Sequence, residues 1–426
     1  MGDLIKIEYD DNKKFNYDQI LTTSIILDLI YKFLEQKDIK LLSLCNKKLY
    51  YFYCGQIKKL SIKNININSA LEKFFNLFKK YENVNELDLS GNKYLIDFPF
   101  LDKLENIEKL DVSDTHISDI SFLEKNNNIK ELKLRKCESI DDFKPLFNLK
   151  KLESLILSFT YISDISFLEN NKNIKILGLY KAKNITDFKT IYNLNKLEVL
   201  ELGETFISDI SFLEKNKNIK ELSLRYNAIE DFKPLFYLNK LELLNLDYTE
   251  IYDISFLENN KNIKELYLRD CTNIVDFTPL LKLIKLEKLD VKGTDISDIS
   301  FLENNKQIKH LYLQECQNIF NFKPLFNLEN LELLDLTKTV ISDISFLEKN
   351  KNIKKLGLEY CEKINDFKSI SNLYKLEDLF LKRTNFSDIS FLNNYKNLKN
   401  LSLPSKFRNK DVLNSGKSKN INISFF

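Results

Sequence analysis

The sequence predicts an α/β solenoid, a fold in which short repeats stack along one axis around a parallel β-sheet. A Leu-x-Leu or Leu-x-Val pair occurs fifteen times between Leu87 and Leu403, in steps of 22 or 23 residues. The string Ile-Ser-Asp-Ile-Ser-Phe-Leu returns, with near-copies, every 44 or 45 residues from Ile117 to Phe386. Apolar residues at alternate positions are typical of a strand with one face inward. A fixed period of roughly 20–29 residues is typical of a solenoid.

The composition agrees with a folded, near-neutral array. The 426 residues contain 64 Lys and Arg against 62 Asp and Glu, which gives a net charge of +2. With 43% hydrophobic residues, including 32 Phe and 20 Tyr, the chain is too apolar to stay disordered in water. Eight Gly and six Pro exclude collagen-like and linker-like chains. Nucleic-acid binding needs a concentrated basic surface, so we expect no nucleic-acid partner.

A small polar residue follows each strand pair and is expected to point inward, where it hydrogen-bonds backbone groups of the neighbouring turn. This column holds Asn92, Thr115, Cys137, Thr160, Ala182, Thr205, Asn227, Thr249, Cys271, Thr294, Cys316, Thr339, Cys361 and Thr384. Successive cysteines here lie at least two coils apart, about 9–10 Å at ordinary strand spacing. Because a disulfide needs Cα atoms within about 7 Å, we expect reduced core thiols.

The other face of each coil carries a recurring acid and a recurring proline. The Asp of the Ile-Ser-Asp-Ile string is expected to cap a short helix, because it precedes a buried Phe-Leu pair. Calcium binding is the alternative, but no second oxygen-rich column accompanies these acids. Pro145, Pro234, Pro279 and Pro324 suit the first turn of a short helix or 3₁₀ segment.

Residues beside the inward leucines are predicted to face the open, concave side of the sheet. Aromatic and Arg side chains crowd the middle of this surface, and such residues often anchor protein interfaces. The alternative is ordinary decoration of a Tyr-rich surface. The candidate partner-binding residues are Phe159, Tyr180, Arg225, Tyr226, Tyr248, Tyr267, Arg269 and Tyr312.

The pattern Leu-x-Leu-x-x-(Asn/Thr/Cys)-x-x-Ile resembles the consensus of leucine-rich repeats over about four fifths of the chain. The short repeat length is similar to that of bacterial internalins and phosphatase-regulatory repeat proteins. The resemblance implies a curved horseshoe with a concave parallel sheet and short convex helices or 3₁₀ turns. We assign residues 56–403 to the repeats and residues 404–426 to a C-terminal cap or tail. Leu60–Ile62 and Ile421–Ile423 are predicted as atypical terminal strands.

Residues 19–55, after a lead-in over residues 1–18, lack the repeat phase and form a predicted helical segment. Tyr31–Tyr50 resembles the second half of an F-box, although Thr22-Thr23 replaces the family's Leu-Pro and Leu49 its Trp. The resemblance implies docking to a Skp-type adaptor of a cullin ubiquitin ligase. The alternative is a plain helical cap on the solenoid. The candidate adaptor-binding residues are Ile26, Ile30, Phe33, Leu34, Ile39 and Leu42.

No motif for catalysis stands out. The chain has only two His, and no Gly-rich phosphate loop, metal-ligand spacing or nucleophile elbow is present. We expect a non-enzymatic protein without cofactor or metal, monomeric before it binds its partner. The most apolar window, residues 20–34, is interrupted by Asp28 and Lys32 and is shorter than a membrane span. We expect no membrane partner and a cytoplasmic location (the host cytoplasm, if viral), which disfavours a secreted adhesin.

The sequence thus predicts a substrate-recognition adaptor of a Skp/cullin-type ubiquitin ligase. The alternative is a stand-alone repeat scaffold whose N-terminal helices are only a cap.

Overall fold

The computed structural model describes residues 5–8, 59–62, 84–93, 96, 106–390, 395–408 and 421–425. The chain divides into two compact units, Met1–Leu197 and Glu198–Phe426. The predicted helical segment over residues 19–55 lies outside the described residues, as do its six candidate adaptor-binding residues.

The first unit is a stack of short coils, each with one three- or four-residue strand. Its strands are β1 (Ile5–Glu8), β2 (Lys59–Ile62), β3 (Glu86–Asp88), β4 (Lys109–Asp111), β5 (Glu131–Lys133), β6 (Ser154–Ile156) and β7 (Ile176–Gly178). The strands from β2 to β7 pair in parallel, whereas β1 pairs antiparallel with β2. The strand at Leu60–Ile62 is confirmed, and the antiparallel edge strand β1 was not predicted.

The second unit repeats the same coil. Its strands are β8 (Val199–Glu201), β9 (Glu221–Ser223), β10 (Leu243–Asn245), β11 (Glu265–Tyr267), β12 (Lys288–Asp290), β13 (His310–Tyr312), β14 (Leu333–Asp335), β15 (Lys355–Gly357), β16 (Asp378–Phe380), β17 (Asn400–Leu403) and β18 (Asn422–Phe425). All pair in parallel, with the inward leucines in register, as for Leu244 and Leu266. The predicted terminal strand near Ile423 is confirmed as β18.

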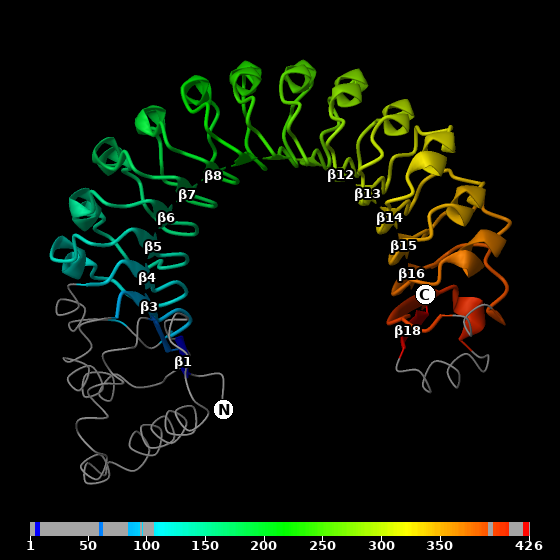
Figure 1. The fold of residues 1–426 in the computed structure, drawn as a ribbon, viewed down its shortest axis with the longest axis horizontal. Coiled ribbons are helices and arrows are strands. Elements are labelled where there is room, and N and C mark those ends of the chain that lie inside the picture. The colour runs from blue at the N-terminus through cyan, green and yellow to red at the C-terminus, as the bar shows by residue number, and fades with distance from the viewer. Residues whose placement is uncertain are drawn as a thin grey trace, which may run out of the picture. The chain divides into compact units, whose positions relative to one another are not determined.

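Among the described residues, a 3₁₀ helix follows each strand from β4 to β15 and also β17. The first unit has η3 (Ser121–Glu124), η4 (Lys144–Asn148), η5 (Ser166–Asn170) and η6 (Lys189–Asn193). The second has η7 (Ser211–Glu214), η8 (Lys233–Tyr237), η9 (Ser255–Glu258), η10 (Thr278–Lys282), η11 (Ser300–Glu303), η12 (Lys323–Asn327), η13 (Ser345–Glu348), η14 (Lys368–Asn372) and η16 (Ser405–Phe407). In each unit the strands line the inner, concave edge of the coils and the 3₁₀ helices line the outer edge (Figure 1). The four recurring prolines lie in the first turn of these helices.

The Asp of the recurring Ile-Ser-Asp-Ile string caps the segment that follows it, as predicted, but it lies one residue earlier than a true N-cap. Asp343 Oδ1 accepts the Ser345 N–H at 2.8 Å, while the N-cap position itself belongs to Ile344. This is an Asx turn, in which a carboxylate bonds the backbone two residues on. The same bond occurs at Asp119, Asp164, Asp209, Asp253, Asp298 and Asp388. It lowers the pKa of Asp343, because the backbone N–H stabilises the ionised form.

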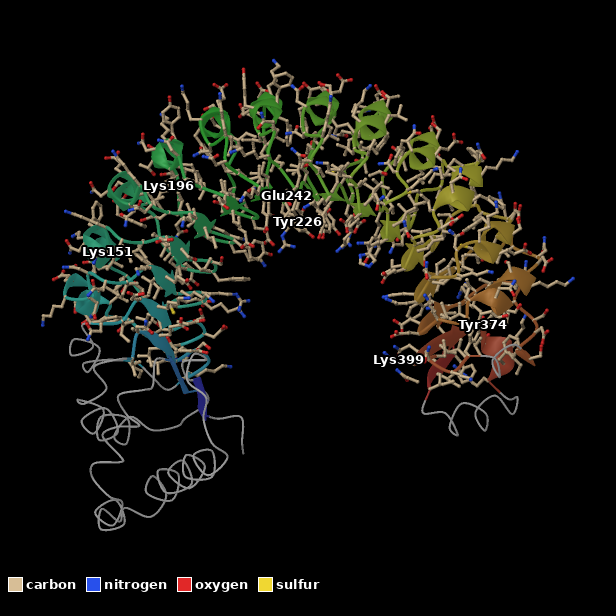
Figure 2. All side chains as sticks on the ribbon, in the orientation of Figure 1. Lys151, Lys196, Tyr226, Glu242, Tyr374 and Lys399 are labelled. Atoms are coloured by element: carbon tan, nitrogen blue, oxygen red, sulfur yellow. The ribbon has the colours of Figure 1, made fainter. Side chains whose placement is uncertain are left out.

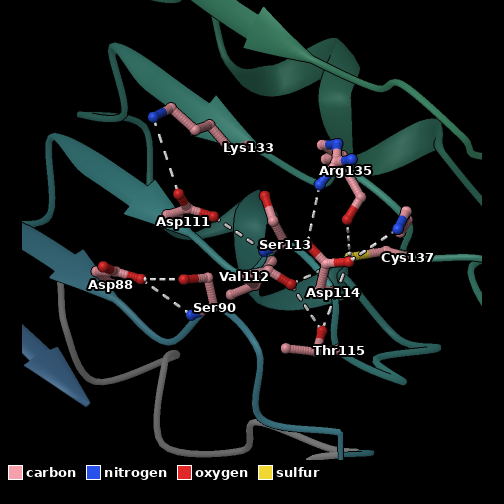
Figure 3. Close-up of polar contacts among 11 residues, drawn as sticks. Asp88, Ser90, Asp111, Val112, Ser113, Asp114, Thr115, Lys133, Arg135 and Cys137 are labelled. Carbon is pink, nitrogen blue, oxygen red and sulfur yellow. Dashed lines mark hydrogen bonds and ion pairs between the residues drawn. The ribbon is translucent and has the colours of Figure 1, made fainter. Parts of the chain in front are cut away.

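The threonines and the cysteines of the post-strand column form hydrogen bonds in two different ways. A threonine bonds its own turn: Thr115 Oγ1 donates to the Val112 carbonyl at 2.7 Å. The cysteine of the next coil reaches back to the same carbonyl, with Cys137 Sγ at 3.1 Å (Figure 3). The prediction of bonds to the backbone of the neighbouring turn is therefore right for cysteine and wrong for threonine. The threonine hydroxyl bonds the backbone of its own turn and meets the neighbouring coil only through the cysteine thiol, with Thr115 Oγ1 3.7 Å from Cys137 Sγ.

The four cysteines of this column are core residues, as predicted. Cys137, Cys271, Cys316 and Cys361 are free and fully buried. Burial raises the pKa of the Cys137, Cys271 and Cys316 thiols to about 11, because the interior disfavours a thiolate. These thiols therefore stay protonated and unreactive at neutral pH.

A second polar column, not predicted, closes the outer side of every other coil. Buried asparagines donate from Nδ2 to backbone carbonyls, as Asn260 does to Leu238 at 2.7 Å and Asn305 to Leu283 at 2.6 Å. In the last copy Tyr395 replaces the asparagine, and its hydroxyl donates to the Ile370 carbonyl. The Leu238, Leu283 and Ile370 carbonyls each also accept a backbone N–H, so these side chains supply a second donor to a carbonyl that has two lone pairs.

Charged residues outside the core pair between neighbouring coils. The ammonium of Lys264 lies 2.6 Å from the Glu242 carboxylate, and six more Lys–Glu pairs repeat this contact. They are Lys130–Glu108, Lys175–Glu153, Lys220–Glu198, Lys309–Glu287, Lys354–Glu332 and Lys399–Glu377. Exposed pairs contribute little stability each. Each pair contributes one positive and one negative charge, in keeping with the near-neutral total of the chain.

Candidate functional site

The turn after each strand from β3 to β16 holds a residue in the left-handed region, and the turn after β8 holds a second one, Phe206. This turn column consists of Gly91, Asp114, Lys136, Phe159, Lys181, Glu204, Tyr226, Tyr248, Asp270, Gly293, Glu315, Lys338, Tyr360 and Arg383. The conformation costs a side-chain-bearing residue roughly 1–2 kcal/mol. It is held by backbone bonds to the next coil, as in Tyr226 N–H to the Asp247 carbonyl at 2.9 Å. The coil stack therefore fixes where these side chains project.

In the first unit the strand face carries Phe159 and Tyr180. Their rings meet edge to face with centroids 5.1 Å apart. Three cations cover the Phe159 ring: Arg135 at 5.3 Å, Lys136 at 5.4 Å and Lys181 at 5.2 Å from its centroid. The ring is thus half-buried rather than bare, and part of the apolar cost expected on this open face is removed by the cations.

In the second unit Tyr226 of the turn column lies on the inner edge (Figure 2), and Tyr248 of the same column is its neighbour on the next coil. The rings of Tyr226 and Tyr248 are stacked, with centroids 4.2 Å apart and an angle of 10° between their planes. Tyr226 is 43% exposed and Tyr248 37% exposed. The stack ends near Asp270, whose carboxylate lies over the α-carbon of Gly293, so that a Cβ there would be 2.1 Å from Oδ1.

Two acids lie beneath this surface. Asp247 and Asp290, expected on the open face, are buried, with 7% and 2% of their surface exposed. Arg269 connects them: its Nη2 lies 2.7 Å from Asp290 Oδ2, and its backbone N–H donates to Asp247 Oδ1 at 2.8 Å. Burial of a carboxylate is costly unless it is paired. This Asp247–Arg269–Asp290 network therefore fixes the Arg269 side chain, which stays about a third exposed.

Tyr267 and Tyr312 flank the same network from the strands. The Tyr267 hydroxyl donates to Glu265 Oε2 at 2.5 Å. The Lys288 ammonium lies 4.8 Å from the Tyr267 ring centroid and 6.0 Å from that of Tyr312. Burial raises the pKa of both phenols, so their hydroxyls remain protonated at neutral pH. We call Arg225, Tyr226, Tyr248, Tyr267, Arg269 and Tyr312 the strand-face cluster.

The structure thus places two of the eight predicted residues in the first unit and the other six in the second. The sequence did not predict that Asp247 and Asp290 are buried, or that Lys288 lies over the Tyr267 ring. The two acids were visible in the columns beside the inward leucines. Nothing local, however, distinguishes a buried acid there from an exposed one.

Asp247 gives the second unit a pH-dependent stability. Burial raises its pKa from an ordinary 3.8 to about 6, and nearby Asp290 adds to the rise while the Arg269 N–H opposes it. The folded chain therefore binds more protons than the unfolded one between about pH 4 and 6, and stability falls as pH rises through that window. Asp247→Asn should remove this slope and raise the free energy of unfolding at pH 7.5 by on the order of 1–2 kcal/mol. Urea unfolding at pH 4.5 and 7.5 checks this prediction. If the free energy of unfolding changes with pH by the same amount in the wild type and in Asp247→Asn, the prediction is contradicted.

Neither metal ligation nor a membrane span is seen in the described part. No group of three or more His, Cys, Asp or Glu among the described residues is placed to hold a metal ion. Of the described helices, none has the length and apolar character to cross a bilayer.

Comparison with solved structures identifies the class of fold. Internalin InlF from Listeria monocytogenes is 24% identical, with 82% of this chain and 87% of that chain aligned at a TM-score of 0.50. The Leptospira interrogans leucine-rich-repeat protein LIC12759 is 18% identical. The alignment covers 89% of this chain and 98% of that chain, with a TM-score of 0.58. The plant peptide hormone receptor RGFR1, solved in complex with RGF2, is 16% identical. The alignment covers 82% of this chain and 63% of that chain, with a TM-score of 0.53.

The fold is therefore a leucine-rich-repeat solenoid, and that prediction is confirmed. No protein-family model matches the sequence. No curated protein matches it either.

Proposed function

We propose that this chain recognises a protein or peptide through the strand face of its second unit, with the strand-face cluster as the anchor. The exposed Tyr226–Tyr248 stack is the observation that carries the proposal. Tyr and Arg are, with Trp, enriched at the energetic centre of protein interfaces. The likeness to RGFR1, which was solved with a peptide hormone bound, supports a solenoid of this fold as a scaffold for such recognition.

The cluster is also rigid before any partner binds. Tyr226 and Tyr248 project from turns whose backbones are bonded to the next coil, and Arg269 is held by Asp290. Immobilising a flexible side chain costs about 0.5–1.5 kcal/mol on binding. Side chains that are already fixed avoid part of that cost, so the cluster gains affinity without new contacts.

Loss of the stack should weaken binding of the partner. Partners captured from a lysate on the wild-type chain are identified by mass spectrometry, and the affinity of the strongest is then measured by calorimetry. The double variant Tyr226→Ala, Tyr248→Ala should bind at least about tenfold more weakly, because each truncated anchor costs more than about 1 kcal/mol. Tyr374→Ala is the control, since Tyr374 is 59% exposed and lies beyond η14, outside the cluster. Equal affinities for both variants would refute the proposal.

The finer assignment is that of a substrate-recognition adaptor in a Skp/cullin-type ubiquitin ligase, with the target on the strand face. Its support is the F-box resemblance of Tyr31–Tyr50. Co-precipitation with a Skp-type adaptor tests it, with Leu34→Asp and Ile39→Asp as controls. If the wild type does not associate with the adaptor, the stand-alone scaffold remains as the assignment. In that case, deletion of residues 1–55 should lower solubility and stability without loss of a particular partner.

A further inference from the structure

One coil of the array is a residue short. The step from Leu222 to Leu244 is 22 residues, where the alternation of 22 and 23 calls for 23. The missing residue falls in the turn after the strand: Asn227-Ala228-Ile229 stands where another coil has Cys271-Thr272-Asn273-Ile274. In the shortened turn the Glu230 N–H donates to the Ser208 carbonyl of the preceding coil at 3.1 Å.

A hollow of about 520 Å³ lies beside this turn, on the flank of the second unit, against the starts of η7, η8 and η9. Its aromatic walls are open to solvent: Tyr252 is 69% exposed, Phe236 50% and Tyr237 45%. Tyr252 replaces the serine that the recurring Ile-Ser-Asp-Ile-Ser-Phe-Leu string has at this position. Large exposed aromatic rings in one depression are unfavourable in water unless a partner covers them.

The charge of the hollow is strongly negative. Its lining includes five acidic side chains and one basic one, whereas the whole chain has a net charge of +2. These are Asp209, Glu214, Glu230, Asp231, Asp253 and Lys233. Acids and aromatic faces together favour an organic cation, since carboxylates attract its charge and ring faces bind it through their quadrupole.

We propose that this flank hollow docks a lysine or arginine side chain presented by a segment of a partner protein. The alkyl stem would pack against Tyr252 and Phe236, and the charged end would meet the carboxylates at the rim. A metal ion fits less well. Asp209, Asp231 and Asp253 each bond a backbone N–H, and no metal-binding group exists among the described residues.

This docking surface is separate from the strand-face cluster. The hollow is built from the turns that lead into the 3₁₀ helices, whereas the cluster is built from strands and the turns that follow them. A substitution in one surface should therefore leave binding at the other surface unchanged. A partner with a basic segment could occupy the flank while the strand face holds another segment.

The test uses the full chain and two fluorescein-labelled nine-residue peptides, one rich in Lys and Arg and one with Glu in their place. Fluorescence anisotropy should show binding of the basic peptide only, weakening as salt is raised, because the contacts are exposed and charged. Tyr252→Ser, which restores the serine of the other copies, should weaken binding about tenfold through loss of the cation–π and stem contacts. Glu230→Lys should weaken it at least as much.

Phe320→Ser is the matched control. Phe320 also precedes a capping side chain (Asn321), is 81% exposed and is absent from the lining of the hollow. This variant, and the Tyr226→Ala, Tyr248→Ala variant, should bind the basic peptide like the wild type. Equal binding of both peptides, or an equal loss in Tyr252→Ser and Phe320→Ser, overturns the proposal. So does Tyr252-dependent dimerisation in sedimentation, which would assign the hollow to a second copy of the chain.

Discussion

Replacement of Phe346 by alanine should lower the free energy of unfolding by about 3–5 kcal/mol, the largest effect we expect from a single substitution in the second unit. The Phe346 ring is 1% exposed and meets Phe326 edge to face, with centroids 6.0 Å apart. Its removal leaves a cavity that neighbouring coils cannot fill, because each coil is fixed by backbone bonds on both sides. Urea unfolding followed by circular dichroism measures the loss.

Phe320→Ala is the control for this prediction. Phe320 lies in the same unit but is 81% exposed, so its truncation should change the free energy of unfolding by less than about 0.5 kcal/mol. In an array each coil is stabilised by its neighbours. Hydrogen exchange in Phe346→Ala should therefore quicken first in β14 and β15, around the lost ring. Equal unfolding midpoints for the two variants would show that Phe346 is not packed in the core.

Arg269→Ala should lower the free energy of unfolding by about 2–3 kcal/mol at pH 7.5. It leaves the Asp290 carboxylate, which is 2% exposed, without the guanidinium that lies 2.7 Å away. Loss of one partner of a buried ion pair costs about 3–5 kcal/mol. We expect less here, because Arg269 is about a third exposed and water screens part of the interaction.

A second substitution separates this charge effect from lost packing. In the Arg269→Ala background, Asp290→Asn removes the stranded charge and should restore most of the stability, so that the double-mutant cycle gives a favourable coupling for the pair. Arg269→Lys keeps the charge but not the planar guanidinium, so its free energy of unfolding should lie between those of the wild type and Arg269→Ala. Additive losses in the cycle would show that Asp290 and Arg269 do not interact.

Much of the fold could be predicted from the sequence because the pattern repeats. One coil places its leucines inward, and the next fourteen confirm the same phase, so Leu244 and Leu266 fall in register as expected. The capping acids and the buried cysteines followed from the same reasoning, since a side chain's place in the period fixes its direction.

The candidate site was only partly predictable. The column positions of Tyr226 and Tyr248 follow from the period, and consecutive coils bring them side by side. Their left-handed turns do not follow, because a tyrosine does not favour that conformation by itself. The burial of Asp247 and Asp290 was also missed, since it depends on Arg269, 22 residues after one acid and 21 before the other.

The sequence by itself therefore determined the coil: its length, its strand, its inward columns and its capping residues. These depend on alternation and period within a few residues of chain, so local chemistry suffices. The tertiary structure alone decided which side chains of adjacent coils meet. The Asp247–Arg269–Asp290 network, the asparagine column and the flank hollow at the shortened turn all join residues about 22 or more positions apart. Their energies arise from burial and contact in space, which no local pattern encodes.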